Sequence, residues 1–438
     1  MDLAATVLAF LDELARAFSY ELGARRPAQW LLFMAPLVLM ELPHHYLPVL
    51  GTMVAHLLGH PRVDADRRRA FLERKPRVSV VVAGRNEGAT IEALIRSLLG
   101  QELEPYEIIV VDDSSDDAMP EVAARFARRG LVRYVRNAAP VGRSGRPGAT
   151  NLGMRLANGD FIVSLDADTT FDRGMLRHLI APFADPGVGV VAGNVLVRNS
   201  RRNLLTRLQT LEYLVSIDLH KRWASLFGRT LQASGAIGAF RRRALLEIRG
   251  WDQELAEDGD ISLRMVKDGW RIAFAPHAVS LTEVPLTWRA LARQRTRWDR
   301  GGFRAYFAKH GRLLLPSVAG ASFAYGMWAE LLFSVVATLA YPVYLAWLLT
   351  QGLFVLLFVM LFCGALYTAL SVLPLLAIPL VNERIHKPLS LLAPALLTPL
   401  YKEGLRWVRV KAIVMELLRV RYEDPFLPDS AWRHAPRF

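Results

Sequence analysis

The chain has little cysteine, and two of its long stretches carry almost no charge. Its single cysteine, Cys363, lies inside an apolar run, which excludes a disulfide within the chain and a cysteine-based metal site. The soluble part is therefore expected in a reducing compartment. Residues 30–59 and 322–380 are almost free of charge, whereas residues 78–310 are mixed and charged. A chain of 438 residues divided in this way has room for a soluble domain and a membrane part.

The N-terminal stretch lacks the features of a cleaved signal peptide. Asp12, Glu13 and Arg16 interrupt its first apolar run, and a basic pair follows that run instead of preceding it. We therefore expect an amphipathic helix that lies in the membrane interface, within a segment that covers residues 1–28.

Positive charge is in excess, with a formal net charge of +13 and a pI near 10.1. Such a balance suits a nucleic-acid-binding protein, but much of the excess lies beside the apolar stretches. Cytoplasmic loops next to membrane spans carry this kind of positive charge. We therefore expect a membrane protein with its charged domain in the cytoplasm, and no nucleic-acid partner. The charges are Arg62, Arg67, Arg68, Arg69, Arg74, Lys75 and Arg77 after the first apolar stretch, and Arg297, Arg300, Arg304, Lys309 and Arg312 before the second.

The apolar stretches are long enough to cross a bilayer, whose core of ~30 Å needs about 20 helical residues. Residues 29–59 contain three prolines and form either a kinked single span or a helical hairpin, of which we favour the single span. Residues 321–350 and 352–380 are cleaner spans, and residues 389–401 either span or dip in and return. The segments predicted after the soluble domain are an interfacial helix at 286–315, a C-terminal membrane region at 321–410 and a tail at 411–438.

Residues 76–285 alternate between apolar runs bounded by turns and helical patterns. Such an alternation predicts a mostly parallel sheet flanked by helices, which is an α/β fold. The expected strands are residues 78–83, 107–111, 131–136 and 160–165, and the expected helices are residues 89–99, 120–129 and 148–157.

Acidic residues follow two of the expected strands, and in open α/β sheets ligands bind beyond the carboxyl ends of strands. Asp112-Asp113 can accept hydrogen bonds from a nucleobase or a ribose hydroxyl, although a solvated turn explains the same residues. Asp166 and Asp168, one residue apart at another strand end, can share a divalent cation whose remaining ligands are substrate phosphates. Such an ion makes a sugar diphosphate a better leaving group.

A third acidic cluster, Glu257-Asp258, lies in a loop further along the chain. Asp258 can take the proton from a sugar hydroxyl on the face opposite the leaving diphosphate. Alternatively, Asp258 or Asp260 caps the amphipathic helix expected at residues 261–267. Both roles can hold for neighbouring residues, with Asp258 catalytic and Asp260 capping.

Residues 294–298, which read Gln-Arg-Thr-Arg-Trp, lie on an amphipathic helix expected at about residues 286–307. Arg297 can pair with phosphate oxygens through its planar fork. The indole of Trp298 offers a flat face to a sugar ring. The alternative is a basic interfacial helix whose tryptophans, Trp288 and Trp298, anchor it in the membrane.

The chain resembles the membrane-embedded processive family 2 glycosyltransferases, which synthesise cellulose, chitin, hyaluronan and poly-N-acetylglucosamine. The resemblance depends on four motifs in a fixed order, with apolar stretches behind them. It implies a GT-A fold with a nucleotide-binding half and an acceptor-binding half, and inversion at the anomeric carbon. The motifs are Asp112-Asp113, Asp166-Ala167-Asp168, Ala256-Glu257-Asp258 and Gln294-Arg295-Thr296-Arg297-Trp298.

The resemblance also implies a role for each matching residue. Asp113 or Asp112 would hold the uridine, and Asp166 and Asp168 would bind the diphosphate and Mg²⁺ or Mn²⁺. Asp258 would be the general base, beside Glu257. Further contacts to the nucleotide sugar would come from Asn86, Glu87, Gln294 and Arg297, and the acceptor would lie against Trp298, Ser234 and Gly235.

Two further segments complete the comparison with that family. Arg146 stands where many of its members carry lysine, and arginine keeps the charge of a diphosphate contact but not its geometry. Residues 201–228 carry leucines near helical spacing, which predicts an interfacial helix that docks the domain on the membrane.

We therefore expect an integral protein of a bacterial inner membrane that polymerises a UDP-linked sugar into a β-linked polysaccharide and passes it across the membrane. One alternative is a non-processive transferase that glycosylates a membrane lipid once. Another is a catalytically inactive subunit that binds a nucleotide in an export complex. The expected partners are the UDP-sugar donor, the growing polysaccharide, the lipid bilayer, and either an export protein or a second copy of the chain.

Overall fold

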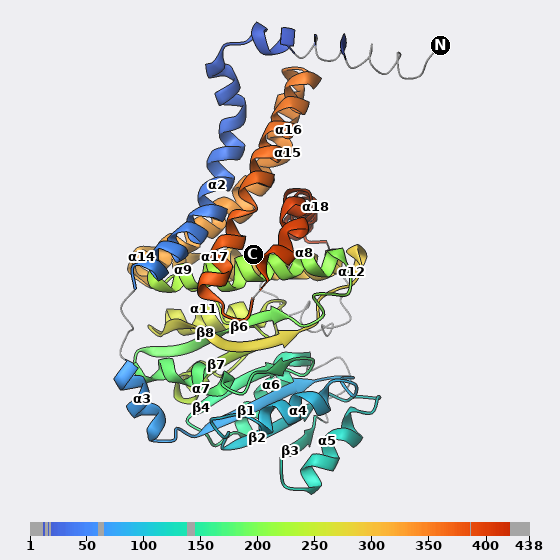
Figure 1. The fold of residues 1–438 in the computed structure, drawn as a ribbon. Coiled ribbons are helices and arrows are strands. Elements are labelled where there is room, and N and C mark those ends of the chain that lie inside the picture. The colour runs from blue at the N-terminus through green and yellow to red at the C-terminus, as the bar shows by residue number, and fades with distance from the viewer. Residues whose placement is uncertain are drawn as a thin grey trace.

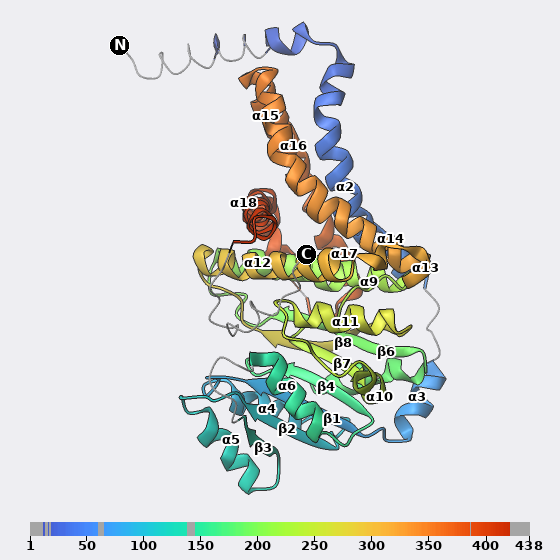
Figure 2. The same ribbon diagram turned by 180° about the vertical axis from the view of Figure 1, so that it is seen from behind.

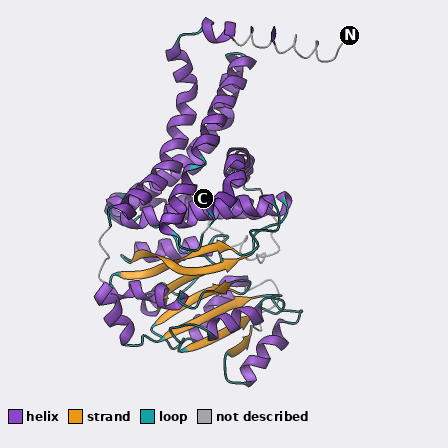
Figure 3. Cartoon of the chain, in the orientation of Figure 1, coloured by secondary structure: helices purple, strands orange, loops and turns teal. Residues whose placement is uncertain are grey.

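The computed structural model describes residues 12–13, 16, 19–59, 65–137, 145–385 and 387–420. Three layers follow one another in Figure 1: a domain built on a sheet, a layer of helices across one end of it, and long helices that project from that layer. Figure 3 shows that the strands lie in the first layer and that the other two are helical. Most of the segment predicted as an N-terminal interfacial helix lies outside the described residues.

The sheet has eight strands in the order β3-β2-β1-β4-β7-β6-β8-β5. β1 pairs in parallel with β2 and β4, β2 with β3, and β6 with β8. β7 is antiparallel to β4 and β6, and β5 to β8, so the sheet is mixed. The strands are β1 (Val78–Gly84), β2 (Glu107–Asp112), β3 (Arg133–Arg136), β4 (Phe161–Asp166), β5 (Thr170–Phe171), β6 (Val188–Val197), β7 (Ile237–Arg241) and β8 (Arg271–Thr282).

The prediction of a mostly parallel sheet is confirmed for β1 to β4 and is incomplete beyond them. Alternation with helical patterns did not predict β6, β7 and β8. β7 is short and contains small residues, with the sequence Ile-Gly-Ala-Phe-Arg. β7 nevertheless occupies the centre of the sheet, between β4 and β6. β7 runs antiparallel to both of its neighbours. It separates the parallel strands β1 to β4, which carry the first acidic motifs, from β6, β8 and β5.

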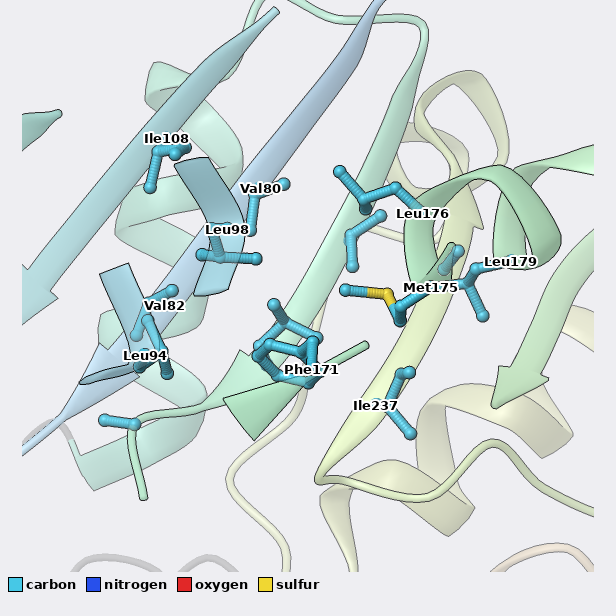
Figure 4. Close-up of a cluster of buried hydrophobic side chains, with 14 of the residues drawn as sticks. Val80, Val82, Leu94, Leu98, Ile108, Phe171, Met175, Leu176, Leu179 and Ile237 are labelled. Atoms are coloured by element: carbon cyan, nitrogen blue, oxygen red, sulfur yellow. The ribbon is translucent and has the colours of Figure 1, made fainter. Parts of the chain in front are cut away.

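Both faces of the central strands are covered by helices with amphipathic spacing. The buried residues of α4 (Ile91–Leu99) recur at the three- and four-residue spacing of one helix face and pack on alternate side chains of β1. Figure 4 shows part of this cluster, where Val80 and Val82 meet Leu94 and Leu98. The other covering helices are α3 (Ala65–Glu73), α5 (Met119–Arg128), α6 (Gly145–Leu156), α7 (Met175–Ile180), η1 (Ala181–Ala184), α10 (Arg242–Glu247) and α11 (Glu257–Lys267).

The second layer consists of helices that lie across the end of the sheet domain (Figures 1 and 2). The leucine pattern at residues 201–228 forms one helix over three successive stretches, α8 (Leu204–Tyr213), η2 (Leu214–Leu219) and α9 (His220–Leu226). The helix predicted at residues 286–307 is confirmed as α12 (Trp288–Phe303), continued by η3 (Arg304–Lys309). The other elements at this level are η4 (Gly311–Leu314), α13 (Pro316–Ala319), η6 (Pro388–Leu391) and α18 (Leu392–Leu417).

The projecting helices are apolar. α2 (Pro27–Leu57) is one continuous helix with three prolines inside it, so the alternative of a helical hairpin is wrong. Two further helical stretches, Ala321–Thr350 and Leu353–Val381, are long and apolar enough to cross a membrane by length and composition. Only 22% and 17% of their most apolar windows are buried within the protein. These stretches comprise α14 (Ala321–Glu330), η5 (Leu331–Val336), α15 (Ala337–Thr350), α16 (Leu353–Leu370) and α17 (Leu373–Val381).

A buried carboxylate joins α18 to the helix that carries the Gln-Arg-Thr-Arg-Trp run. Glu416 on α18 accepts a hydrogen bond from Arg300 Nε at 2.9 Å and another from Arg304 Nε at 2.8 Å. All three side chains are buried. α18 continues to Leu417 and carries Glu416 against α12 and η3, so the boundary predicted at residue 410 falls inside it. Residues 421–438 of the predicted tail lie outside the described residues.

Replacing Glu416 with alanine is expected to destabilise the contact between α12 and α18. Two buried guanidinium groups would lose the carboxylate that they share, which costs about 3 kcal/mol in comparable buried ion pairs. Unfolding of the detergent-solubilised protein measures the loss. Glu92→Ala is the control, because Glu92 pairs with Arg96 on an exposed surface and should cost less than about 1 kcal/mol. Equal losses in the two variants would contradict the prediction.

Candidate active site

Three strand ends and one strand start meet at the same edge of the sheet. Gly84 at the end of β1 pairs with Asp112 at the end of β2, and Ala83 pairs with Asp166 at the end of β4. β7 is antiparallel, so its first residue, Ile237, pairs with Leu165 at this edge. The acidic motifs and the loop before β7 are therefore neighbours, although the sequence separates them widely.

Arg146 on α6 joins these segments. Its Nη2 lies 2.6 Å from Asp166 Oδ1 and donates to the backbone oxygen of Gly235 at 2.6 Å. Its Nη1 forms an ion pair with Glu257 at the start of α11. Burial lowers the pKa of Arg146, but the charges of Asp166, Glu257 and Asp258 outweigh burial and leave it raised. Arg146 stays charged and holds β4, α11 and the loop before β7 together.

Asp258 is held by the loop before β7. Its Oδ2 accepts a hydrogen bond from the Gly235 N–H at 2.9 Å, and its Oδ1 accepts one from the Gly259 N–H at 2.8 Å. α11 begins at Glu257, one residue before Asp258, and its N-cap position is Ala256, whose side chain cannot cap. The structure thus brings Asp166 and Asp258 into one site, linked by Arg146 and Gly235.

The capping role predicted for Asp260 is wrong. Asp260 lies inside the first turn of α11 and is fully buried. Its Oδ1 lies 2.7 Å from His310 Nε2 and 2.8 Å from Lys309 Nζ. The residue therefore ties α11 to the end of η3 by buried charge pairing, which the sequence spacing does not reveal.

Asp168 has the chemistry of a metal ligand. Its Oδ1 is buried without a hydrogen-bond partner. Burial raises the pKa of Asp168 to about 7, helped by the charges of Asp166 and Glu87. A divalent cation would relieve this repulsion, and hard oxygen donors are what Mg²⁺ and Mn²⁺ accept. The residues present fit such an ion.

The described residues contain no group of three or more histidine, cysteine, aspartate and glutamate side chains arranged to hold a metal by themselves. A bound ion would therefore complete its coordination with other oxygens. Mg²⁺ commonly binds through one or two carboxylates together with substrate phosphates. A diphosphate that chelates the ion beside Asp166 and Asp168 meets this requirement.

The pair Asp112-Asp113 divides into a buried and an accessible residue. Asp112 is fully buried and accepts hydrogen bonds from the Tyr134 hydroxyl at 2.7 Å and from the Ser115 N–H at 2.8 Å. Both the solvated turn and a nucleotide contact are therefore wrong for Asp112, which braces the loop. Asp113 is only partly buried and accepts from Asn137 Nδ2 at 2.7 Å, so it is the member of the pair that a nucleotide could reach.

The loop after β1 is shaped by Asn86 and Glu87. Asn86 has a φ of 59° and its Oδ1 accepts from the Asp116 N–H at 3.0 Å, so its side chain braces the two loops. Asparagine tolerates this left-handed conformation better than most residues. Glu87 accepts from Thr90 Oγ1 at 3.0 Å, and burial followed by the charge of Asp166 raises its pKa. Glu87 thus lies on the acidic side of the site.

The Gln-Arg-Thr-Arg-Trp run lies on α12, which passes close to the start of α11. A Cβ at Gly301 would come within 2.9 Å of the Ala256 side chain, so the helix can approach only because residue 301 is glycine. Trp298, three residues earlier, is 40% exposed. Gln294 Oε1 is buried without a hydrogen-bond partner, and Arg297 is partly buried on the next turn.

The orientation of Trp298 depends on residues that the sequence does not single out. The Arg295 guanidinium lies 4.3 Å from the centre of the Trp298 ring, a cation–π contact. Glu212 on α8 holds Arg295 at 2.9 Å and accepts from the Tyr401 hydroxyl of α18 at 2.6 Å. Three helices thus fix the indole. The signal in the sequence is a second arginine inside the run, at a position that faces inward.

The predicted acceptor loop is also held by an unexpected residue. Ser234 Oγ accepts a hydrogen bond from Lys221 Nζ at 2.9 Å. Lys221 lies on α9, two helical turns after Leu214, so it continues the buried leucine face of that helix. A lysine on an otherwise apolar helix face is the sequence feature that could have indicated this contact.

Comparisons with known proteins identify the family of the chain. Residues 76–301, more than half of the chain, match the family described as glycosyltransferase like family 2. The chain belongs to this family. It is therefore a family 2 glycosyltransferase, and the resemblance to that family is confirmed.

Curated relatives include polysaccharide synthases. The family 2 chain is 32% identical over 244 residues to a poly-beta-1,6-N-acetyl-D-glucosamine synthase of Staphylococcus aureus strain COL, which covers 53% of this chain and 58% of that protein. It is 32% identical over 227 residues to the synthase of the same name from Staphylococcus epidermidis, covering 51% and 54%. The chain thus spans about half the length of the curated relatives it matches.

A solved structure shows the fold. A mannosyltransferase from Pyrobaculum calidifontis, in complex with GDP-Man and Mn²⁺, matches with a TM-score of 0.58 at 22% sequence identity, covering 85% of this chain and 99% of that one. The fold of this glycosyltransferase is GT-A-like, with a mixed sheet flanked by helices.

The raised pKa of Asp168 predicts how the stability of the metal-free protein depends on pH. The pKa rises from an ordinary 3.8 to about 7, so this group stabilises the fold below pH 4 and that stabilisation is lost as the pH rises through about 7. In EDTA, Asp168→Asn should be more stable than the wild type above pH 7 by on the order of 2–4 kcal/mol, and should lose this advantage at low pH.

Thermal unfolding between pH 4 and pH 8 measures this difference. Asp116→Asn is the control, because Asp116 is exposed and its variant should follow the wild type. Parallel curves for wild type and Asp168→Asn across the range would show that Asp168 is not strained by burial and its acidic neighbours.

Proposed function

We propose that the protein is an inverting, processive glycosyltransferase that polymerises a UDP-linked sugar into a β-linked polysaccharide and passes the product across a membrane. The observation that carries the proposal is Arg146, which brings the diphosphate-side carboxylate of Asp166 and the base candidate Asp258 into one site. The polysaccharide synthases among the relatives support N-acetylglucosamine as the first sugar to test.

The donor would lie across the carboxyl edge of the sheet. Asp113 would contact the nucleoside, and Asp166, Asp168 and Glu87 would face its diphosphate. A Mg²⁺ or Mn²⁺ ion held by Asp166 and Asp168 would neutralise the diphosphate and make it a better leaving group. Arg146 already holds Asp166 and Glu257, so we propose that it orders the site and leaves direct diphosphate contact to Arg297 and Gln294.

The acceptor would enter beside Trp298, Ser234 and Gly235. Asp258 would remove the proton from its terminal hydroxyl while the oxygen attacks the anomeric carbon and the bond to the diphosphate breaks on the opposite face. The new glycosidic bond is then β if the donor linkage is α. The peptide of Gly235 holds Asp258 at 2.9 Å, so the base is oriented before the acceptor arrives.

The apolar helices support a membrane location. Two stretches are long and apolar enough to span, and less than a quarter of their most apolar windows is buried inside the protein, which is unlike the core helix of a soluble domain. We propose that they and α2 cross a bacterial inner membrane with the sheet domain on the cytoplasmic side. α8 with α9, α12 and α18 would then lie along its surface, and α18 would dip rather than span, since it packs along α12 and α8.

Incubation of the purified protein with labelled UDP-sugars and Mg²⁺ or Mn²⁺ tests the proposal. A long polymer from UDP-N-acetylglucosamine supports it. A glycolipid with a single added sugar would show a non-processive transferase, and no transfer with retained UDP binding would indicate an inactive subunit of an export complex.

Asp258→Asn should abolish transfer while leaving UDP binding nearly unchanged, because the amide keeps the shape of the side chain and can still accept one of the two backbone hydrogen bonds, but it cannot take up a proton. Loss of a general base costs about 10²–10⁴-fold in rate. Initial rates and calorimetric UDP binding measure the two effects. Asp268→Asn, at the exposed far end of α11, is the matched control. Polymer synthesis at a comparable rate by Asp258→Asn would show that another group is the base.

Trp298→Ala should shorten the polymer more than it weakens UDP binding, because the indole face is offered to the acceptor. Stacking on an aromatic ring contributes on the order of 1 kcal/mol, or several-fold in acceptor affinity. Gel sizing of the product and UDP titration measure the two effects. Trp328→Ala, an exposed tryptophan on α14, is the control. Chain lengths like those of the wild type would refute a role in acceptor binding.

A further inference from the structure

Lys221 places a positive charge beside the acceptor loop, residues 233–236. Its Nζ donates to Ser234 Oγ at 2.9 Å. Among the described residues, no carboxylate lies within salt-bridge distance of this ammonium. Removing a charge from water without an ion pair costs free energy unless something compensates. An uncharged donor would make the same hydrogen bond with a smaller desolvation free energy, so the charge of Lys221 needs its own explanation.

The charge acts on Asp258 at a distance. Burial lowers the pKa of Lys221 to about 8, and the negative charge of Asp258 opposes this shift. The charge of Asp258 therefore favours the ionised form of Lys221. Lys221 and Asp258 are also linked through two consecutive residues. Lys221 donates a hydrogen bond to Ser234, and the N–H of the next residue, Gly235, donates to Asp258 Oδ2.

The acceptor loop is fastened from the sheet domain at three points. Asp258 accepts from the Gly235 N–H, Arg146 donates to the Gly235 oxygen, and the Ser262 hydroxyl accepts from the Ala233 N–H at 3.1 Å. Lys221 adds a fourth point from the helix layer on the opposite side. A displacement of Ser234 would therefore move the peptide that orients the base.

The helix that carries Lys221 is itself fixed to α2. Thr52 Oγ1 donates to the Leu219 oxygen at 3.0 Å, and His220 Nε2 contacts the His45 oxygen at 3.1 Å. Gly51 has no room for a side chain, because a Cβ there would overlap the Trp223 ring. α9 lies in the layer between α2 and the sheet domain in both Figure 1 and Figure 2. Lys221 thus reaches the site from a firmly held helix.

We propose that Lys221 is a positioning residue of this glycosyltransferase. Its charged ammonium holds Ser234, and through the adjoining peptide it keeps the Gly235 N–H on Asp258. The chemical consequence depends on the proposed role of Asp258 as base, whereas the holding of the loop does not. When Lys221 loses its proton, the ion-dipole contact to Ser234 weakens, the positive charge near Asp258 disappears, and transfer slows.

Several other ionisable groups lie around this contact and must be separated from Lys221. The group that acts directly on its charge is Asp258. Arg146 on α6 contacts Gly235 and pairs with Glu257 on α11. Tyr306 on η3 feels the charges of Asp258 and of Glu330 on α14. The groups next to Lys221 along the chain are His220, which contacts His45 on α2, and Arg222.

The test compares Lys221→Met and Lys221→Arg with the wild type in the full-length protein. Lys75→Met, an exposed lysine before β1, is the control. Hydrogen–deuterium exchange of the peptide that contains residues 233–236 is measured with UDP and Mn²⁺, and needs no turnover. Rates of transfer are measured between pH 7 and pH 9.5, with kcat and acceptor KM determined separately.

Lys221→Met should increase exchange in the acceptor loop and lower kcat about 10- to 100-fold, because a small misplacement of a catalytic group has effects of this size. The wild-type rate should fall as the pH rises through about 8. Lys221→Arg should restore protection of the loop and shift this fall to higher pH, because arginine keeps its charge. If Lys221 only stabilised the fold, the pH at which the rate falls would be the same with lysine and with arginine at position 221.

Unchanged exchange in Lys221→Met would overturn the proposal, whether or not transfer is observed. An alkaline limb that is the same in wild type and Lys221→Arg would also overturn it, while the polymerase activity itself stands. If the wild type transfers no sugar but Lys221→Met still loosens the loop, the proposed function fails and the positioning role of Lys221 stands.

Discussion

The ion-pair junction at Arg146 is the interaction on which the site depends. One guanidinium binds Asp166 at the end of β4, Glu257 at the start of α11 and the Gly235 oxygen before β7. Without a cation at this point, the carboxylates of Asp166, Glu257 and the nearby Asp258 would repel one another in a partly buried pocket. With it, acids from separate parts of the chain can share one site. Arginine suits this role because its planar fork presents several donors in fixed directions.

The same junction gives the arginine at position 146 a role that a lysine could not fill. An ammonium is a point charge on a flexible stem and would bind a diphosphate directly. A guanidinium can instead bridge two carboxylates and a backbone oxygen at once. Arg146 thus organises the protein around Asp166, Glu257 and Gly235.

The second organising feature is the way in which the helices that lie across the sheet domain are joined to the site. Glu416 on α18 holds Arg300 and Arg304 after the Gln-Arg-Thr-Arg-Trp run, while Glu212 on α8 holds Arg295 within it. Lys221 makes the corresponding link from α9 to the acceptor loop. Charged side chains between helices, rather than apolar packing alone, thus set the position of α12 and the acceptor loop relative to Asp258.

Local sequence patterns are sufficient to predict part of this protein. The parallel strands β1 to β4, the helices between them and the helix that carries Trp298 follow from apolar periodicity and turn residues. The motifs at Asp113, Asp166 to Asp168 and Asp258 follow from strand ends and from resemblance to a family. These signals are local because they depend on neighbours within one element.

The environment of the charged side chains depends on residues that are distant in the sequence, and it is visible only in the folded protein. Folding buried Asp112 against Tyr134, turned Asp260 into an internal ion pair, and placed β7 in the centre of the sheet so that Gly235 reaches Asp258. It also brought Lys221, Arg295 and Glu212 into the site. The physical reason is that the state of a charged side chain is set by which groups surround it after folding, and the sequence pattern around the residue does not contain that information.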